Sequence, residues 1–160
     1  MNSRYKVGDY EARHNEPAWR DRANFVIAAE IANMSGKREW EQLWARKLSE
    51  TRFEICCIPF FTYDLALGDE VETDGDFVLR RVVKPSGHFT FRVWFGNSKD
   101  PECRTHVMEV LLRENCEREW SSENLLAIDA PTRQKAQALA DALTILAKSG
   151  HVEFENGRTS

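Results

Sequence analysis

The sequence lacks the patterns that mark several common classes of protein. No window approaches about 18 consecutive apolar residues, the length needed for a membrane-spanning helix. Residues Met1 to Asn24 are polar and charged, so they do not form the apolar core of a secretory signal. Only eight glycines are present, and none has the Gly-x-Gly-x-x-Gly or phosphate-loop spacing of nucleotide-binding proteins.

An excess of positive charge is also absent. The chain has 22 Lys and Arg residues against 26 Asp and Glu residues, which gives a formal net charge of −4. Nucleic-acid binding requires clustered cations that contact phosphates. From the charge and the missing apolar runs, we expect neither nucleic acid nor membrane among the partners.

The cysteines and histidines show no metal-binding pattern. The sequence has no Cys-x-x-Cys pair, and no histidine lies at zinc-finger spacing from a cysteine. If the adjacent Cys56 and Cys57 lie on a strand, they point to opposite faces, which is poor geometry for one metal. We expect no metal or other cofactor and four buried free thiols in a cytoplasmic protein, with a redox role or a disulfide as the alternative. His14, His106 and His151 are isolated and are expected to be ordinary surface or helix residues.

The composition predicts one folded domain. Hydrophobic residues make up 42% of the chain and aromatic residues 11%, too many for a disordered protein. Residues 1–23 show no clear periodicity, so we expect a charged leader that is mobile unless Trp19 docks it. The prediction is a leader over residues 1–23, a single α+β domain over 24–157 and a tail over 158–160.

The first part of this domain, residues 24–84, is predicted to form a small antiparallel β-sheet or barrel. Short apolar segments separated by turn residues favour strands. The expected strands are Phe25–Ile31, Trp40–Leu48, Phe53–Pro59, Gly68–Val71 and Phe77–Val83. The spacing of Trp40–Leu48 also fits a helix, but its position between strands favours the extended form.

The second part, residues 86–157, is predicted to have the order β-α-β-β-α-β. Phe89, Phe91, Val93 and Phe95 alternate with other residues, which indicates a strand with one buried face. Asp100-Pro101-Glu102 is typical of a helix start, and a second helix is expected between Pro131 and Gly150. The remaining strands are expected at Cys116–Trp120, Leu125–Asp129 and Val152–Phe154. This order is that of the ferredoxin-like arrangement.

Several blocks of this sequence resemble a bacterial family. The first is the run Ile58-Pro59-Phe60-Phe61-Thr62-Tyr63-Asp64-Leu65-Ala66-Leu67-Gly68-Asp69-Glu70-Val71. The others are Arg80-Arg81-Val82-Val83, Ser86-Gly87-His88, Arg92-Val93, Leu125–Pro131 and Val152–Gly157. Together they are similar to the pattern of the family known as domain of unknown function 4265, over roughly residues 24–157. The resemblance implies the element order given above but implies no activity.

Ser86, His88 and Arg92 form the best cluster of polar residues. On an extended segment they lie on one side, with neighbouring side chains about 6.5–7 Å apart at their roots. A hydrogen bond between Ser86 and His88 therefore requires a bend at Gly87. Three interpretations stay open: a structural turn, a ligand or partner site with Arg92 as an anion contact, and hydrolytic catalysis. No Gly-x-Ser-x-Gly elbow supports the third.

Six carboxylates fall within a stretch of 13 residues. They are Asp64, Asp69, Glu70, Glu72, Asp74 and Asp76. Their spacing is not that of an EF-hand. They are predicted to form a solvated edge that deters strand pairing, an acidic surface for a basic protein or, less favoured, a catalytic carboxylate pair.

Four tryptophans, Trp40, Trp44, Trp94 and Trp120, are expected to pack the core, although Trp94 could face outward as an interface anchor. Together these features favour a non-enzymatic cytoplasmic binding protein. Its most specific form is a toxin-neutralising immunity or inhibitor protein whose acidic surface binds a basic toxin domain. The alternative is a small-ligand-binding or regulatory domain with a cleft site at Ser86, His88 and Arg92; a hydrolase or transferase is less favoured.

Overall fold

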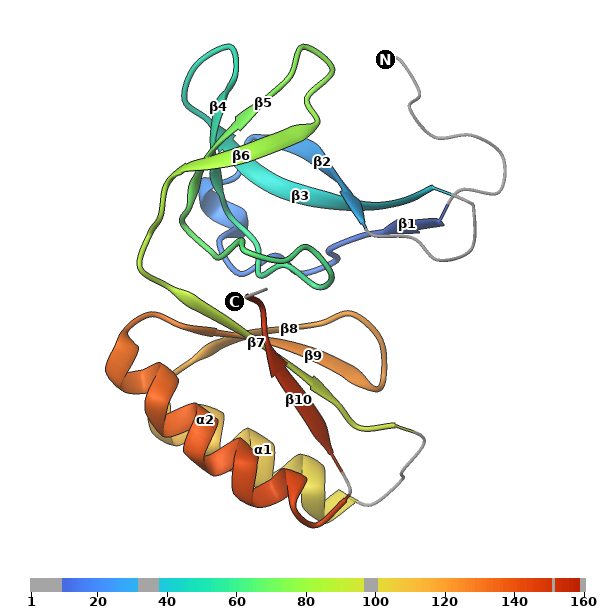
Figure 1. The fold of residues 1–160 in the computed structure, drawn as a ribbon, viewed down its shortest axis with the longest axis vertical. Helices are drawn as coiled ribbons and strands as arrows, with labels where there is room; N and C mark the ends of the chain where they lie inside the picture. The colour runs from blue at the N-terminus through green and yellow to red at the C-terminus, as the bar shows by residue number, and fades with distance from the viewer. Residues whose placement is uncertain (1–9, 32–37, 97–100, 151, 159–160) are drawn as a thin grey trace.

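The computed structural model describes residues 10–31, 38–96, 101–150 and 152–158. These residues form a mixed α+β fold with ten strands in two sheets and two α-helices. Figure 1 shows three layers along the long axis: a barrel-like sheet, a second sheet beneath it and two helices below that sheet. Neither helix in the described part of the chain is both long enough and apolar enough to cross a membrane.

The first half is a small, nearly closed antiparallel sheet. Its main strands are β2 (Phe25–Ile31), β3 (Glu39–Lys47), β4 (Arg52–Ile55), β5 (Glu70–Thr73) and β6 (Leu79–Lys84), each antiparallel to the one before. A bridge between Ala28 and Val78 brings the end of the sheet back against β2. A further strand, β1 (Tyr10–Ala12), runs parallel to the start of β3.

The extended form predicted for the Trp40–Leu48 segment is confirmed. Glu41, Leu43 and Ala45 are fully buried, whereas the even-numbered Gln42 and Trp44 are only half-buried. This two-residue period is that of a strand with one face toward a core. Glu41 therefore places a carboxylate on the inward face of β3.

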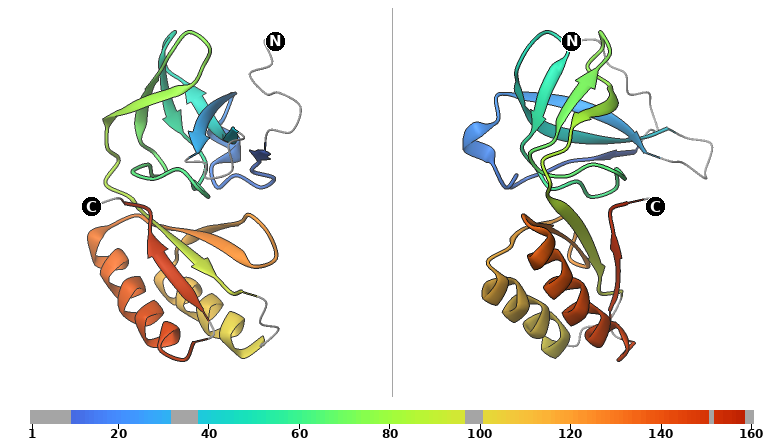
Figure 2. Two further views of the ribbon diagram at one scale, coloured as in Figure 1. Left: turned by 45° about the vertical axis from the view of Figure 1, so that its right-hand side comes forward. Right: turned by 60° about the vertical axis from the view of Figure 1, so that its left-hand side comes forward.

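The second half follows the predicted order of elements. It consists of β7 (Phe89–Trp94), α1 (Pro101–Glu114), β8 (Glu117–Trp120), β9 (Leu125–Ala130), α2 (Arg133–Ala147) and β10 (Glu153–Asn156). The strands lie in the order β10-β7-β9-β8, and all neighbours are antiparallel. Figure 2 shows both helices on the same face of this sheet. Thr132 starts α2 by accepting a hydrogen bond from the Lys135 amide, and Leu139 and Leu143 of α2 are buried in the core.

The first half covers part of the other face of the second sheet. A small apolar cluster of Ile58, Phe60 and Leu67 packs against Ala127 of β9. These first three residues belong to the connection between β4 and β5, which is buried although it is not a strand. The predicted strand Phe53–Pro59 is therefore too long, since β4 ends at Ile55.

The domain also begins earlier than the predicted boundary at residue 24. β1 pairs with β3, a short 3-10 helix η1 covers Arg20–Arg22, and the Trp19 amide donates to the Cys56 carbonyl at 3.0 Å. Residues 10–23 are therefore part of the packed structure. The rest of the predicted leader, the helix N-cap Asp100 and His151 lie outside the described residues.

Candidate functional site

A buried histidine lies between two buried glutamates where the two halves meet. His14 Nε2 is 2.7 Å from Glu41 Oε2, and His14 Nδ1 is 2.8 Å from Glu119 Oε1. Because both carboxylates accept hydrogen bonds, both ring nitrogens donate and the ring is an imidazolium. The expectation that His14 is an ordinary surface or helix residue is wrong.

Three distant segments supply this cluster. His14 follows β1, and the pairing of Ala12 with Glu41 places it at the start of β3. Glu119 comes from β8, 105 residues farther along the chain. The ring of Phe60 stacks on the imidazole at 3.9 Å between centroids. The cluster therefore links the N-terminal segment, the barrel and the second sheet.

The two glutamates also bind the backbone of the β4–β5 connection. Glu41 accepts hydrogen bonds from the amides of Phe60, Phe61 and Thr62 and from the Thr62 hydroxyl, at 2.7–3.1 Å. Glu119 Oε2 accepts from the Ile58 amide at 2.5 Å and from the Ala18 amide at 3.2 Å. A buried loop must satisfy its backbone groups, and these carboxylates do so in place of a strand partner.

Pairing outweighs burial in setting the charges of this cluster. Burial lowers the pKa of His14, but Cys57, Glu119 and Glu41 raise it well above its ordinary value of 6.5. Burial raises the pKa of Glu41, but hydrogen bonds from His14, Phe60 and Thr62 bring it below its ordinary value of 4.5. The cluster therefore holds charge inside the protein, which predicts a structural function with a defined pH range.

Arg92 holds the same loop from the opposite side. Its Nε donates to the Pro59 carbonyl at 3.3 Å, one Nη donates to the Thr62 carbonyl, and the other lies 3.2 Å from Glu155 Oε1. Its guanidinium lies 4.9 Å from the centre of the Tyr63 ring. Arg92 is 4% exposed. Three of its five N–H donors thus have protein acceptors and the side chain is almost fully buried, which argues against the predicted anion contact.

His88 is held by a different carboxylate. Its Nδ1 lies 2.9 and 3.0 Å from the two oxygens of the buried Asp129. The hydrogen bond to Asp129 raises the pKa of His88 more than its partial burial lowers it. The Trp19 ring lies edge-on to the imidazole at 5.9 Å. Asp129 therefore fixes the orientation of the ring and leaves Nε2 as its other polar atom.

Ser86 does not form a nucleophile–base pair with His88. Its Oγ donates to the Leu67 carbonyl at 2.7 Å and accepts from the His88 backbone amide at 3.1 Å. Its own amide donates to Asp69 Oδ1, while Asp69 Oδ2 accepts from the Ala66 amide. Gly87 has a φ of +88°, the bend that the sequence requires there. Among the three interpretations, the geometry of Ser86 favours the structural turn.

His88 and Arg158 line a cavity of about 140 Å³ between the two halves. The wall from the first half includes Leu65, Ala66 and Asp69. The wall from the second half includes Thr90 and Gly157, and the Gly157 carbonyl accepts from the Asp64 amide. Arg158, which the sequence assigned to a tail, is therefore part of the folded unit.

The acidic run between residues 64 and 76 is interleaved with arginines. Glu72 lies 3.2 Å from both Arg52 and Arg81, and Asp74 lies 2.6 Å from Arg80. Asp69 is buried in its turn, Glu70 is half-buried opposite Lys84, and Asp64 and Asp76 are exposed. The structure therefore does not gather the six carboxylates into one surface of a single sign.

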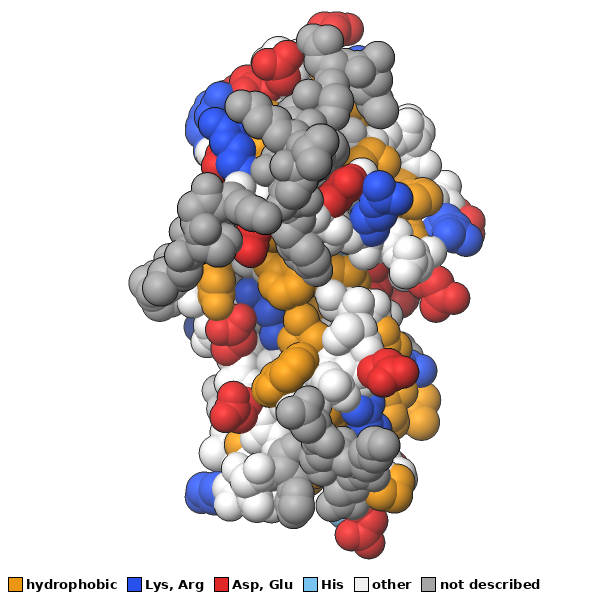
Figure 3. Space-filling view, turned by 90° about the vertical axis from the view of Figure 1, so that its right-hand side faces the viewer, with side chains coloured by type: hydrophobic (Ala, Val, Ile, Leu, Met, Phe, Trp, Pro, Cys, Tyr) orange, Lys and Arg blue, Asp and Glu red, His pale blue; other side chains and the backbone are white. Residues whose placement is uncertain are grey.

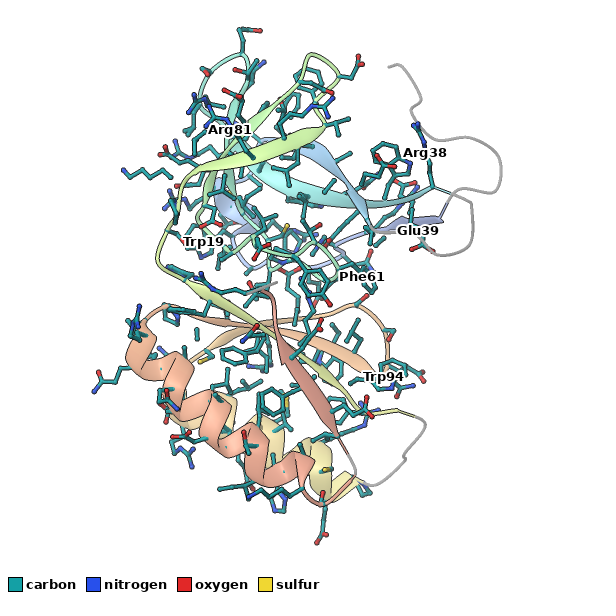
Figure 4. All side chains as sticks on the ribbon, in the orientation of Figure 1. Trp19, Arg38, Glu39, Phe61, Arg81 and Trp94 are labelled. Atoms are coloured by element: carbon teal, nitrogen blue, oxygen red, sulfur yellow. The ribbon has the colours of Figure 1, made fainter. Side chains whose placement is uncertain are left out.

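Trp94 lies on the face of the second sheet that the barrel covers only in part. It is 43% exposed and its Cα partner across the sheet is the exposed Glu153. Arg92, two residues away on the same face of β7, has Glu155 as its Cα partner across the sheet. The Glu155 carboxylate accepts a hydrogen bond from the hydroxyl of Tyr63, which is 45% exposed. We call Tyr63, Trp94, Glu153 and Glu155 the Trp94 surface. Figure 3 shows apolar side chains in the middle of this side, and Figure 4 places Phe61 and Trp94 on it.

The structure also tests the expectations for the tryptophans and the cysteines. Trp40 is buried as predicted, but Trp120 is 40% exposed and is not a core residue. All four cysteines are buried and free. Within the described ranges, no group of three or more His, Cys, Asp or Glu side chains could hold a metal ion. The sequence carried no signal for the His14 cluster, because its members are far apart along the chain.

Comparison with known proteins identifies a family but not an activity. A family model described as a domain of unknown function (DUF4265) matches residues 41–154. A solved structure of a hypothetical protein from Neisseria gonorrhoeae is similar, with a TM-score of 0.69 and 16% sequence identity. The match covers 84% of this chain and 96% of that one, which shows a shared fold. No curated protein matches the chain.

Proposed function

Because the chain belongs to the DUF4265 family, whose description assigns no role, we propose a function from its own surface: it is a non-enzymatic protein that binds a basic protein partner through the Trp94 surface. The observation that carries this proposal is the exposure of Trp94 on the sheet face that the barrel covers only in part. Large exposed aromatic side chains are enriched among the residues that dominate binding energy at protein interfaces.

The chemistry of the Trp94 surface favours a cationic partner. A Lys or Arg side chain of the partner can lie over the indole of Trp94 and at the same time pair with Glu153, its neighbour across the sheet. Glu155 adds a second carboxylate, part of whose charge is already offset by Arg92. An aromatic ring beside carboxylates therefore selects a basic segment over an acidic one.

In its most specific form, the proposal is an inhibitor or immunity protein that neutralises a basic toxin domain in the bacterial cytoplasm. The Trp94 surface would anchor the partner, and exposed carboxylates elsewhere on the protein would speed its approach by electrostatic attraction. The arginines beside Glu72 and Asp74 reduce the contribution of the acidic run to that steering. We therefore locate the partner contact at Trp94 and not at residues 64–76.

Two finer assignments accompany this proposal. The second half is assigned to the ferredoxin-like arrangement, which is supported by its element order and by the strand order β10-β7-β9-β8. A hydrolase or transferase has less support, because Ser86 Oγ donates to a backbone carbonyl and Arg92 is buried and bonded to protein acceptors. A cytoplasmic location stays a prediction.

Site-specific photo-crosslinking in the native host tests the proposal. A photoreactive phenylalanine analogue in place of Trp94 should capture a specific protein with a basic surface. The same analogue in place of Ile145, which is 70% exposed on α2, is the matched control. The captured protein should be lost when Glu153→Lys is added, and its association rate should fall steeply with salt.

The companion measurement separates an interface from a structural role. Trp94→Ala should weaken binding of the captured protein by about 2 kcal/mol or more, as for an interface hot spot. The free energy of unfolding of the Trp94→Ala protein should differ from that of the wild type by less than about 1 kcal/mol, because Trp94 lies at the surface with 43% of its area exposed. Equal capture at positions 94 and 145, or binding that is insensitive to Glu153→Lys, would contradict the proposal.

A further inference from the structure

The cavity between the halves has walls of opposite charge. The wall from the first half carries Asp64 and Asp69, and the wall from the second half carries His88 and Arg158. The lining also includes the apolar side chains of Leu65, Ala66, Val82 and Pro85. A cavity with a carboxylate wall, a cationic wall and an apolar lining matches a small molecule that has both charges and a short aliphatic group.

We propose that this cavity binds a small aliphatic α-amino acid, with its carboxylate toward His88 and Arg158 and its ammonium group toward Asp69. The proposal does not depend on the Trp94 surface, which lies on other residues. It assigns a ligand site that includes His88 but neither Ser86 nor Arg92, whose polar groups are bound within the protein.

The cationic wall is oriented by contacts inside the protein. Asp129 occupies Nδ1 of His88, so Nε2 is the nitrogen available to a ligand, and no hydrogen bond of Nε2 occurs among the described residues. The guanidinium of Arg158 lies 4.9 Å from the centre of the Phe89 ring, at the start of β7. When His88 is protonated, its Nε2 and the Arg158 guanidinium can donate to the two oxygens of one carboxylate.

The opposite wall can accept an ammonium group. Each oxygen of Asp69 accepts one backbone amide, from Ser86 at 2.8 Å and from Ala66 at 2.9 Å. A carboxylate has about four acceptor sites, so Asp69 can accept further hydrogen bonds. No ion pair of Asp69 occurs among the described residues, so an ammonium group is a complementary ligand for its carboxylate.

The size of the cavity limits the side chain of the ligand. The cavity volume of about 140 Å³ is below the roughly 300–1,000 Å³ of sites for drug-sized ligands, so a small ligand is favoured. Alanine, with six non-hydrogen atoms, is among the smallest molecules that carry both charges and an aliphatic group. The apolar lining at Leu65 and Val82 favours a methyl group over a polar side chain.

Titration of the full-length protein with L-alanine, followed by NMR of the His88 imidazole and the Trp19 indole, tests the site. Trp19 reports on the same ring, since its indole contacts His88. Propionate and ethylamine each retain one of the two charges of alanine and serve as matched probes. L-alanine should give saturable chemical-shift changes. Propionate and ethylamine should each bind at least tenfold more weakly, because each lacks one charged contact.

Arg158→Gln is the main variant, because Arg158 is exposed and can be replaced without disturbing the core. It should weaken L-alanine binding roughly tenfold or more, whereas Arg133→Gln on α2 should leave it unchanged. His88→Gln should also weaken it, with folding checked by circular dichroism. Propionate or ethylamine binding as tightly as L-alanine, or wild-type affinity in Arg158→Gln, would overturn the proposal.

Discussion

Replacing His14 with glutamine is expected to be among the most destabilising single substitutions in this protein. The substitution leaves Glu41 and Glu119 buried without the cation that they share at 2.7 and 2.8 Å. It also removes the ring that stacks on Phe60. Removal of one partner from a buried ion pair costs about 3–5 kcal/mol, and the remaining backbone donors offset part of it, so we expect a loss of about 4 kcal/mol. That is a large part of the roughly 5–15 kcal/mol that stabilises a typical domain.

The effect should depend on pH in a specific direction. The pKa of His14 is raised in the folded state, so its contribution is complete below 6.5 and is lost as pH rises through the folded value. The pKa of Glu41 is lowered, so its contribution is complete above 4.5 and is lost as pH falls through its folded value. The stability difference between wild type and His14→Gln should therefore be largest between pH 4.5 and pH 6.5.

Urea unfolding of both proteins at several pH values measures this difference. His106→Gln on α1 is the control, because His106 is exposed and should give a difference near zero at every pH. Midpoints should shift while the denaturant dependence of the unfolding free energy stays constant, if the native state keeps its compactness. A loss below about 1 kcal/mol, the size expected of a surface pair, or a difference that does not vary with pH, would refute the imidazolium assignment.

Three further substitutions and one labelling reaction test other parts of the structure. Arg92→Met should lower the free energy of unfolding by about 3 kcal/mol, because it leaves two loop carbonyls without their donor and removes a partly buried ion pair. Urea unfolding measures this loss. Leu139→Ala should cost about 2–5 kcal/mol by thermal or urea unfolding, since the side chain is fully buried. Ile145→Ala, on the exposed side of the same helix, should cost less than about 0.5 kcal/mol. Burial raises the pKa of Cys56 to about 12, so thiol labelling at pH 8 should reach it only after unfolding.

The sequence predicted the elements whose stability depends on local patterns. Phe25–Ile31 was expected as a strand and is β2 with the same bounds. The helices were recognisable because proline or a capping residue starts each one and apolar residues recur on one face. Residues 10–23 gave no such pattern, since β1 is only three residues long and is held by β3. Short segments that depend on a distant partner carry no periodicity of their own.

The candidate site was less predictable because its contacts are between distant residues. Ser86, His88 and Arg92 were recognised as a group, but each has its own partner: Leu67, Asp129 and the Pro59–Thr62 loop. Spacing along a strand shows which residues share a face, but not which acceptor the fold brings to each. For the same reason, the sequence could not distinguish a serine that binds a carbonyl from a serine that is free to react.

The carboxylates show where a partner contact can be located. Glu41 and Glu119 are buried and accept hydrogen bonds from backbone amides, so their charge serves the fold. Glu72 is on the surface but lies between two arginines, so little of its charge acts at a distance. Glu153, in contrast, is exposed and lies beside an exposed indole. Position in the fold, and not the density of acidic residues along the chain, therefore makes Trp94 and Glu153 the first residues to test for a partner.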